Sequence, residues 1–304
     1  MANAALFIAT VLIWGTTWIA IAMQVGPVPV LVSVFYRFAV AAAILVAILA
    51  VMRRLNFPAL RDQPFILAQA LCLFSLNFIC FYNAAGFIPS GLISVIFSLA
   101  TIYNAVNARL FFGDRITGRT LLAAALGATG LLLLFGEEVV VDFNMGTLKG
   151  IGLAALGTLF FSLGNMASRR NSAAGISPVT ANAWGMTYGS VFLLFLIAAK
   201  QTPIVAPPDI TYLTALLYLA AIGSVIGFTT YLMLVSRIGS SRAAYATVLF
   251  PIVALSLSTV FEGYHWSGLG LIGLALTLLG NVVIFARPLV RRPPQTDARL
   301  PAGG

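Results

Sequence analysis

Charge is scarce in this sequence. Only 8% of the 304 residues are Asp, Glu, Lys or Arg, and 61% are apolar, whereas about a quarter of an ordinary soluble domain is charged. So few charges cannot cover a water-exposed surface, and most of the outer surface must therefore face lipid. The composition excludes a soluble enzyme, a disordered chain and a nucleic-acid-binding protein, although the net charge is +9.

Cysteine and histidine are almost missing. Cys72 and Cys80 are the only cysteines, and His265 is the only histidine. On one helix, the eight-residue spacing of the cysteines places their Cα atoms about 12 Å apart, which is beyond the reach of a disulfide. A single histidine at a predicted helix end provides no catalytic or metal-binding pair. We therefore expect no disulfide, no metal, no cofactor and no enzymatic activity.

Long apolar runs are abundant. Their length of about 20 residues is that of a helix that crosses a bilayer, and they are too continuous for the strands of a membrane β-barrel, which alternate over about 10 residues. The sequence predicts an all-α membrane protein with ten transmembrane helices, near 3–24, 30–52, 64–85, 90–108, 120–136, 149–168, 178–199, 211–235, 243–261 and 268–286.

Basic residues are unevenly distributed between the two sets of connecting segments. Counted from a cytoplasmic N-terminus, the inner segments hold 14 of the 17: Arg53, Arg54, Arg61, Arg109, Arg115, Arg119, Arg169, Arg170, Arg237, Arg242, Arg287, Arg291, Arg292 and Arg299. The outer loops hold only Lys149 and Lys200. Because basic residues concentrate in cytoplasmic loops, both termini are predicted to be cytoplasmic. Residues 287–304 are polar and rich in proline, so we expect a disordered cytoplasmic tail.

The two halves of the sequence resemble each other at an offset near 148–151 residues. Ser75 and Tyr82 stand seven residues apart in the third predicted helix, as Ser224 and Tyr231 do in the eighth, and FGDRITG at 112–118 matches FEGYHWSG at 261–268. With five helices in each half, the two copies must cross the membrane in opposite directions. We predict two inverted five-helix repeats, residues 1–148 and 149–286, a construction typical of alternating-access transporters.

Several short motifs resemble one family. They are Trp14-Gly15 in helix 1, Pro27 and Pro29 followed by Arg37-Phe38 in helix 2, FFGDRIT after helix 4, and Pro251 with Phe261-Glu262 in helix 9. Over about residues 5–286 the sequence resembles the EamA-type branch of the drug/metabolite transporter superfamily, and within it the YddG-type amino acid exporters of the bacterial inner membrane. Where that family often has proline in helix 4, this chain has Thr101-Ile102-Tyr103, so we expect the kink there to be absent or shifted.

Substrate recognition in such a protein must depend on polar and aromatic side chains that face a central cavity. The candidates within the predicted spans are Trp14, Asn77, Phe78, Tyr82, Ser98, Tyr103, Phe161, Asn165, Trp184, Tyr188, Ser224, Phe228, Tyr231 and Tyr245. Those that recur in both halves, the Ser75–Tyr82 and Ser224–Tyr231 pairs, are favoured. The alternative is structural, because Ser in a span often bonds its own backbone and Trp or Tyr near a span end often lies in the membrane interface.

Arg37 is the one charge well inside a predicted span. Intramembrane charge is costly and therefore indicates a role. Arg37 could bind a substrate carboxylate, or it could pair with an outer acid such as Glu262 or with free carbonyls, and the recurrence of this residue in the family motif favours the structural role. Asp114 and Glu262 close helices 4 and 9 at matching positions and are interpreted as helix-end anchors.

The pattern as a whole predicts an exporter of small metabolites, with amino acids that have aromatic or other apolar side chains as the leading substrates. Its expected partners are the small-molecule substrate and the lipid bilayer, with no nucleic acid. Helices 5 and 10, rich in Leu, Ala and Gly, are expected to be packing struts or a dimer contact, so the protein is expected to be a monomer or homodimer. The alternatives are an exporter of another metabolite or a drug, and an intramembrane enzyme.

Overall fold

The computed structural model describes residues 2–136, 144–238 and 246–285, and within these ranges it contains helices and no strand. The helices are α1 (Ala2–Ala22), α2 (Val30–Val51), η1 (Leu60–Asp62), α3 (Gln63–Leu71), η2 (Cys72–Leu76), α4 (Asn77–Ala84), α5 (Ser90–Ser98), α6 (Ala100–Phe112), α7 (Gly118–Gly136), α8 (Met145–Ala173), α9 (Pro178–Ala199), α10 (Ile210–Leu217), η4 (Tyr218–Ile226), α11 (Gly227–Ile238), α13 (Ala246–Phe261) and α14 (Gly268–Phe285). The predicted all-α class is confirmed. The tail at 287–304 lies outside the described residues.

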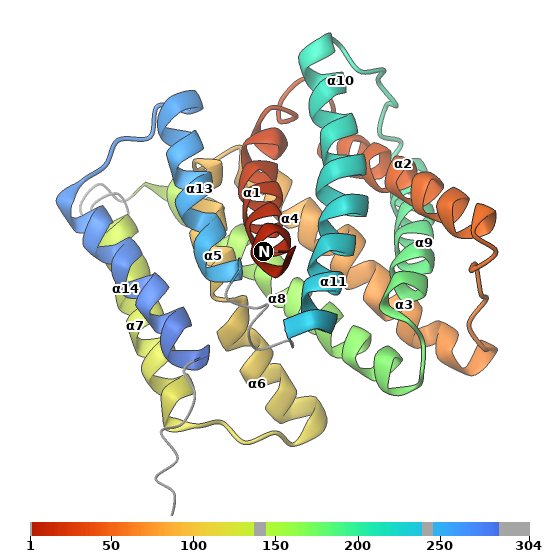
Figure 1. The fold of residues 1–304 in the computed structure, drawn as a ribbon. Helices are drawn as coiled ribbons and strands as arrows, with labels where there is room; N and C mark the ends of the chain where they lie inside the picture. The colour runs from red at the N-terminus through yellow and green to blue at the C-terminus, as the bar shows by residue number, and fades with distance from the viewer. Residues whose placement is uncertain (1, 137–143, 239–245, 286–304) are drawn as a thin grey trace, which may run out of the picture.

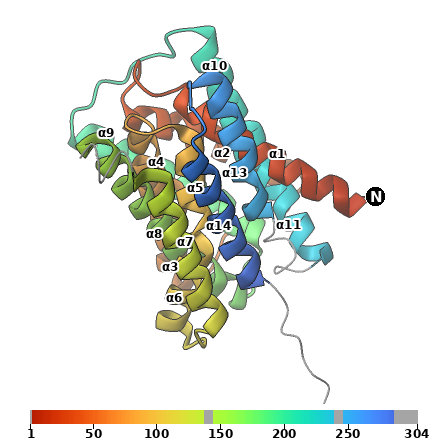
Figure 2. The ribbon, with the colours of Figure 1, turned by 90° about the vertical axis from the view of Figure 1, so that its left-hand side faces the viewer.

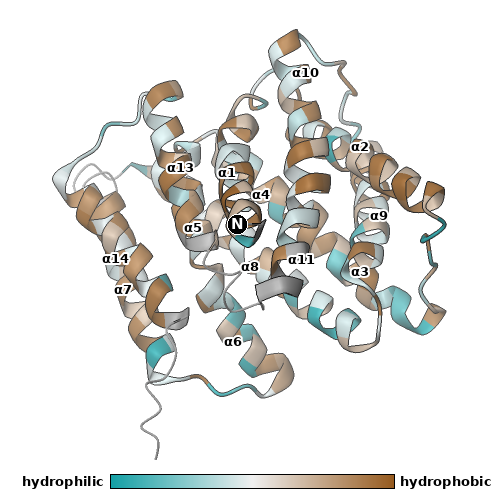
Figure 3. Cartoon of the chain, viewed as in Figure 1, coloured by the Kyte–Doolittle hydropathy of each residue, from teal (hydrophilic) through white to brown (hydrophobic). Residues whose placement is uncertain are grey.

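Eight of these helices or helix runs are long and apolar enough to cross a membrane, and two shorter apolar helices, Leu249–Phe261 and Gly268–Val283, follow them. Apolar residues cover the helices along their length, while hydrophilic residues gather where chain segments connect, for example between α2 and α3 (Figure 3). This distribution is what a multi-pass membrane protein requires, because lipid replaces water along the helix sides.

The third and eighth predicted helices each contain a π-helical segment. η2 carries Ser75 and η4 carries Ser224, and each hydroxyl donates a hydrogen bond to the carbonyl five residues earlier, on Ala70 and Leu219. A π turn holds an extra residue, so each segment changes the helical register between the residues before it and those after it. Ser75 consequently contacts the Gly189 carbonyl on α9, whereas the Tyr82 hydroxyl donates to Gln24 after α1. The two side chains of this pair therefore contact different parts of the molecule.

The fourth predicted helix is interrupted without a proline. α5 ends at Ser98 and α6 begins at Ala100, with Leu99 between them at φ −71° and ψ −2°. The interruption therefore lies two residues before Thr101. It directs α6 away from α5, so that the two helices point differently (Figure 1).

Helices α7 and α14 pair along one edge of the molecule, as both views show (Figures 1 and 2). Their backbones are so close that a Cβ atom built on Gly273 would lie 2.5 Å from the carbonyl oxygen of Gly130. Small residues permit this approach in membrane helices. Large side chains such as Leu121, Leu132 and Ile272 remain more than half exposed on the outside of the pair. The fifth and tenth helices thus pack on each other.

Two ends of the molecule can be distinguished by the loops that they carry (Figure 1). We call the Glu262 end the one with the α9–α10 and α13–α14 loops, at the top of the figure, and the Asp114 end the one with the α6–α7 and α8–α9 loops, at the bottom. Helix α1 lies centrally, packed on α13, α11 and α5. The core of the fold is therefore formed where helices from the first and second halves of the chain meet.

Candidate functional site

A cavity of about 70 Å³ lies at this meeting point. It is lined by α1, α2, α4 and α5 from the first half of the chain and by α8, η4, α11 and α13 from the second, through Trp14, Thr17, Trp18, Ile21, Arg37, Asn77, Phe78, Phe81, Phe97, Phe161, Gly223, Phe228 and Phe250. Most of these side chains are aromatic. The cavity can therefore bury an apolar group against ring faces without directional demands.

Phe97 is the hub of the aromatic lining. Its ring centroid lies 4.6 Å from that of Phe161, 5.4 Å from Trp18, 5.5 Å from Phe81 and 5.7 Å from Phe250. These rings come from four helices besides α5 itself, so Phe97 holds both halves of the lining in place. The sequence candidates did not include Phe97, Phe81 or Phe250.

A larger cavity of about 430 Å³ continues from the smaller one. The two share Trp14, Phe97, Phe161 and Phe228. The larger cavity adds polar side chains, Thr101, Asn104, Asn165, Ser168 and Asn182, and it reaches Arg169, whose side chain is 48% exposed. Together the cavities form a path from the middle of the molecule to the Asp114 end, with amide groups along the wider part.

Half of the residues proposed from the sequence lie in this lining. They are Trp14, Asn77, Phe78, Phe161, Asn165, Phe228 and Tyr231, together with Arg37. Of the missed residues, Asn104 and Asn182 carry the clearest signal, because an amide in the middle or at the end of an apolar helix requires a partner: Asn104 accepts a hydrogen bond from Asn165, and Asn182 accepts one from Gln69.

The other candidates that the structure describes lie outside the lining of both cavities. Tyr82 is fully buried and donates to Gln24, and Ser224 accepts a bond from Arg37. Ser98 donates to the Val95 carbonyl and accepts from Asn281 on α14.

Three further candidates also lie away from the cavities. Trp184 and Tyr188 on α9 donate to the Asn56 carbonyl and to Gln63, and so fix the segment between α2 and α3. Tyr103 on α6 is partly exposed. Tyr245 lies outside the described residues.

Arg37 is 3% exposed and projects into the smaller cavity. Its Nε donates to Ser224 at 3.4 Å, and its guanidinium carbon lies 4.3 Å from the centre of the Phe78 ring. Its Nη1 has no hydrogen-bond partner among the described residues. The expected pairing with Glu262 is wrong, because the carboxylate of Glu262 is bound elsewhere.

Glu262 links α5 to α13 at the Glu262 end. Its carboxylate accepts hydrogen bonds from the Ser90 backbone N–H (3.1 Å to each oxygen), from the Ser90 hydroxyl (2.7 Å) and from Ser258. Ser258 in turn accepts from the Gly91 N–H at 2.8 Å. Because α5 begins at Ser90, the negative charge lies at a helix N-terminus, where it is stabilised. We call these residues, Ser90, Gly91, Ser258 and Glu262, the Glu262 cluster.

The corresponding acid at the other end is exposed. Asp114 and Arg169 form an ion pair at 2.7 Å, with their side chains 47% and 48% exposed. The hydrogen bonds from Arg169 lower the pKa of the Asp114 carboxyl below its ordinary value. This pair joins the segment that follows α6 with helix α8. The larger cavity lies beside the pair.

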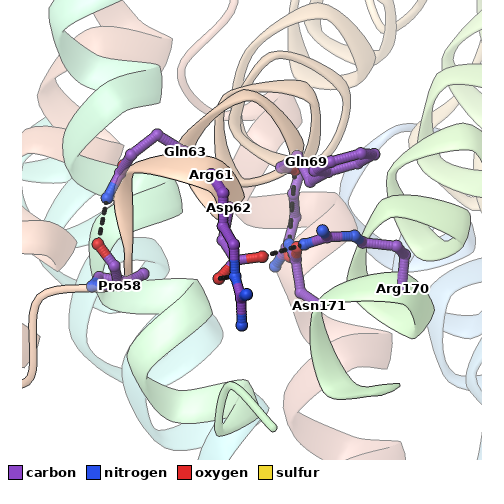
Figure 4. A network of polar contacts seen from close by, with 8 residues as sticks. Pro58, Arg61, Asp62, Gln63, Gln69, Arg170 and Asn171 are labelled. Atoms are coloured by element: carbon purple, nitrogen blue, oxygen red, sulfur yellow. Dashed lines mark hydrogen bonds and ion pairs between the residues drawn. The ribbon is translucent and has the colours of Figure 1, made fainter. Parts of the chain in front are cut away.

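A second polar network at the Asp114 end fixes α3 to α8 (Figure 4) and, through Asn182, to α9. The Arg170 Nη1 donates to Asp62 at 2.6 Å, and its guanidinium stacks over Phe65. The amide of Gln69 accepts from Asn171 and donates to Asn182. This end is therefore anchored at α3, α8 and α9, on one side of the cavity.

Comparison with known proteins identifies the family. The sequence profile of the EamA-like transporter family matches residues 2–136 and again 148–286. A solved crystal structure superposes with a TM-score of 0.66 at 19% identity, covering 93% of this chain and 96% of that one. At this identity the likeness shows the fold alone.

Curated relatives agree with this assignment. The chain is 26% identical to protein PagO of Salmonella typhimurium over 96% of its own length and 94% of that protein, and 27% identical to the inner membrane transporter YedA of Escherichia coli over 93% and 92%. A probable amino-acid metabolite efflux pump of Escherichia coli is 23% identical over 90% and 92%. The two profile matches cover most of the sequence, and the protein belongs to the EamA-like transporter family.

Proposed function

We propose that the protein exports small amino-acid-like metabolites across the bacterial inner membrane by alternating access between two inverted halves, residues 1–148 and 149–286. The single observation that carries the proposal is the central cavity, which is lined by both halves, reaches Arg169 at the Asp114 end and has no residue of the Glu262 cluster in its lining. A cavity that is continuous with one end only is what an alternating-access transporter has in one of its two states.

Three further observations support this function. The family profile matches each half once. The π-helical segments that carry Ser75 and Ser224 occur at corresponding places in the two halves. A probable terminal-alkyne amino-acid exporter of Streptantibioticus cattleyicolor is 24% identical over 94% of both chains. The aromatic lining suits amino acids with apolar side chains, since ring faces bury such groups well.

Orientation is part of the proposal. With both termini in the cytoplasm, as the basic residues favour, the Asp114 end faces the cytoplasm and the cavity is loaded from inside. In a variant without Cys72 and Cys80, a cysteine at Ala206, in the α9–α10 loop, should react with an impermeant maleimide from outside intact cells. A cysteine at Ile116, in the α6–α7 loop, should react only after the cells are opened. The reverse pattern would contradict the orientation.

Transport itself is tested in proteoliposomes loaded with a radiolabelled amino acid such as phenylalanine. We expect efflux down the substrate gradient, competed by other apolar amino acids and lost when Phe97, the hub of the lining, is replaced by Ala. Leu132→Ala, on the exposed side of α7, serves as the matched truncation of a large side chain. Efflux that is unaffected by Phe97→Ala would contradict the role of this cavity.

A further inference from the structure

Arg37 is a buried cation without a counter-ion. The three ion pairs formed within the described ranges involve Arg61, Arg169 and Arg170, and Arg37 takes part in none of them. Its neighbours are neutral: the Ser224 hydroxyl, the rings of Phe38 and Phe78, and Tyr82, which lies close enough to interact electrostatically. An unpaired charge in a dry interior is strongly unfavourable, so this arrangement is suited to receiving an anion.

Asn77 supplies a second unused donor in the same place. It is 1% exposed and lines the smaller cavity together with Arg37. Its side-chain oxygen accepts a hydrogen bond from the backbone N–H of Phe78 at 2.8 Å, which fixes the orientation of the amide. Its Nδ2 has no hydrogen-bond partner in the part of the chain that the structure describes. One small cavity therefore contains two buried donors, one of them charged, and both lack an acceptor.

The rest of the lining indicates the chemical character of the ligand that carries the anionic group. Among the described residues around the smaller cavity none is acidic, and the remaining surface is formed mainly by the rings of Trp14, Phe97, Phe161 and Phe228. Those four rings continue into the cavity of about 430 Å³, which has room for the larger part of a ligand. A phosphate, with its higher charge, would need further cations, and Arg169 is already paired with Asp114.

We propose that Arg37 and Asn77 bind the carboxylate of a small monocarboxylate whose apolar or aromatic part lies among these rings. This inference rests on the proposed function and narrows it. The carboxylate is the group that the site requires. An ammonium group meets no acidic side chain in the smaller cavity, only the Thr17 hydroxyl and aromatic faces, whose attraction for a cation is weak, and it is repelled by Arg37. A carboxylic acid without an amino group should therefore bind, whereas an amino acid amide should not.

A first experiment needs no ligand. Asn77→Asp keeps the shape of the side chain and its bond to the Phe78 N–H, and places a carboxylate beside Arg37. We expect the thermal unfolding temperature of the purified full-length protein to rise above that of the wild type. Asn77→Leu, of similar size and without a charge, should not raise it. A fall with Asn77→Asp as large as with Asn77→Leu would overturn the inference.

A second experiment uses three probes that share one ring: phenylalanine, 3-phenylpropanoate and phenylalaninamide. We expect the two carboxylates to stabilise the wild-type protein and to compete with each other, and the amide to need at least about a tenfold higher concentration, the factor expected for one charge-assisted hydrogen bond. Arg37→Gln and Asn77→Asp should both abolish this preference, whereas Arg61→Gln, an exposed arginine, should keep it. Equal stabilisation by acid and amide would overturn the inference.

Efflux assays separate this inference from the export function. Export of a cargo that lacks a carboxylate, with no preference for acids, would refute the carboxylate site and leave export intact. A stabilised Asn77→Asp protein together with acid-selective binding, but no efflux of any probe from proteoliposomes, would support the site and refute export.

Discussion

Glu262 and Asp114 follow matching stretches of sequence, yet the structure gives them different surroundings. Glu262 accepts hydrogen bonds from Ser90 and Ser258 and joins α5 to α13 at a helix N-terminus. Asp114 lies half exposed in an ion pair with Arg169, beside a cavity. An acidic side chain thus joins two helices at the Glu262 end, whereas at the Asp114 end it lies beside the larger cavity. Because the two positions match in sequence, the difference in their surroundings distinguishes the two ends of the molecule.

The largest loss of stability is expected when a larger side chain is placed between α5 and α13 at the Glu262 end. A Cβ atom on Gly91 would lie 2.7 Å from both the Leu255 Cα and the Ser258 Oγ, so Gly91→Val cannot fit without separating α5 from α13. We expect a loss of more than about 3 kcal/mol in the free energy of unfolding, above the usual cost of overpacking because the clash is with backbone.

The matched control for this wedge is Gly118→Val at the Asp114 end, where a new Cβ meets nothing within 4 Å. Thermal unfolding of the purified protein compares the two variants. If Gly118→Val destabilised as much as Gly91→Val, the two ends would not differ in packing.

A smaller effect is expected when the charge in the Glu262 cluster is removed. Glu262→Gln keeps the size of the side chain but replaces charge-assisted hydrogen bonds by neutral ones, so we expect a loss of about 1.5–3 kcal/mol in stability. The Glu262 end should also open more easily, and a cysteine at Ser94, one turn inside α5, should react faster with a maleimide applied from that side. Unchanged reactivity would show that the cluster does not hold the end closed.

The polar network at the Asp114 end should respond less. Asp62→Asn removes the ion pair with Arg170, in which the Arg170 side chain is 30% exposed and the Asp62 side chain 7%, so we expect a loss of about 1 kcal/mol, the upper end for pairs open to solvent. Thermal unfolding should therefore shift slightly, and access to the cavity should stay the same. A large change in the labelling of a cysteine at Asn104 would mean that α3 and α8 control the entrance after all.

The smallest effect is expected for Asp114→Asn. The pair with Arg169 lowers the pKa of Asp114 in the folded protein, so its contribution is present above the ordinary value of 3.8 and is lost as the pH falls through the lowered pKa. At neutral pH the substitution should change thermal stability less than Glu262→Gln does, and the change should shrink in high salt because the pair is exposed. A salt-independent loss would indicate a buried role.

Much of the fold could be predicted because lipid imposes a simple rule: each crossing needs about 20 apolar residues. The predicted helices agree with the structure to within a few residues in most cases, for example 178–199 and α9 (Pro178–Ala199). The site was harder. Trp14, Asn77 and Phe161 were identified as polar or aromatic residues within spans, but Phe97 stands in a run of apolar residues that looks like any core, and only the bend at Leu99 and the packing of α13 make it central.

Tyr82 shows where sequence periodicity stops being informative. Its repetition in both halves suggested a cavity residue, and in this conformation it lies outside both cavities, bonded to Gln24. Its hydroxyl reaches Gln24 in the segment after α1, a long-range contact that no helical periodicity can anticipate. A hydroxyl residue that bonds the carbonyl five positions earlier can be recognised only once the backbone is known.

The π-helical segments also offer a way for part of a helix to rotate while the helix remains continuous. Successive residues of an α-helix are rotated by about 100°. When a π turn moves along the chain by one residue, the side chain at that residue is therefore rotated by about this angle. Asn77 and Phe78 follow η2 directly, and Phe228 follows η4. In each half, therefore, residues of the cavity lining directly follow a π-helical segment. A shift of the π turn by one residue in η2 or η4 would rotate a ligand-facing side chain out of the cavity, while the helix would still cross the bilayer.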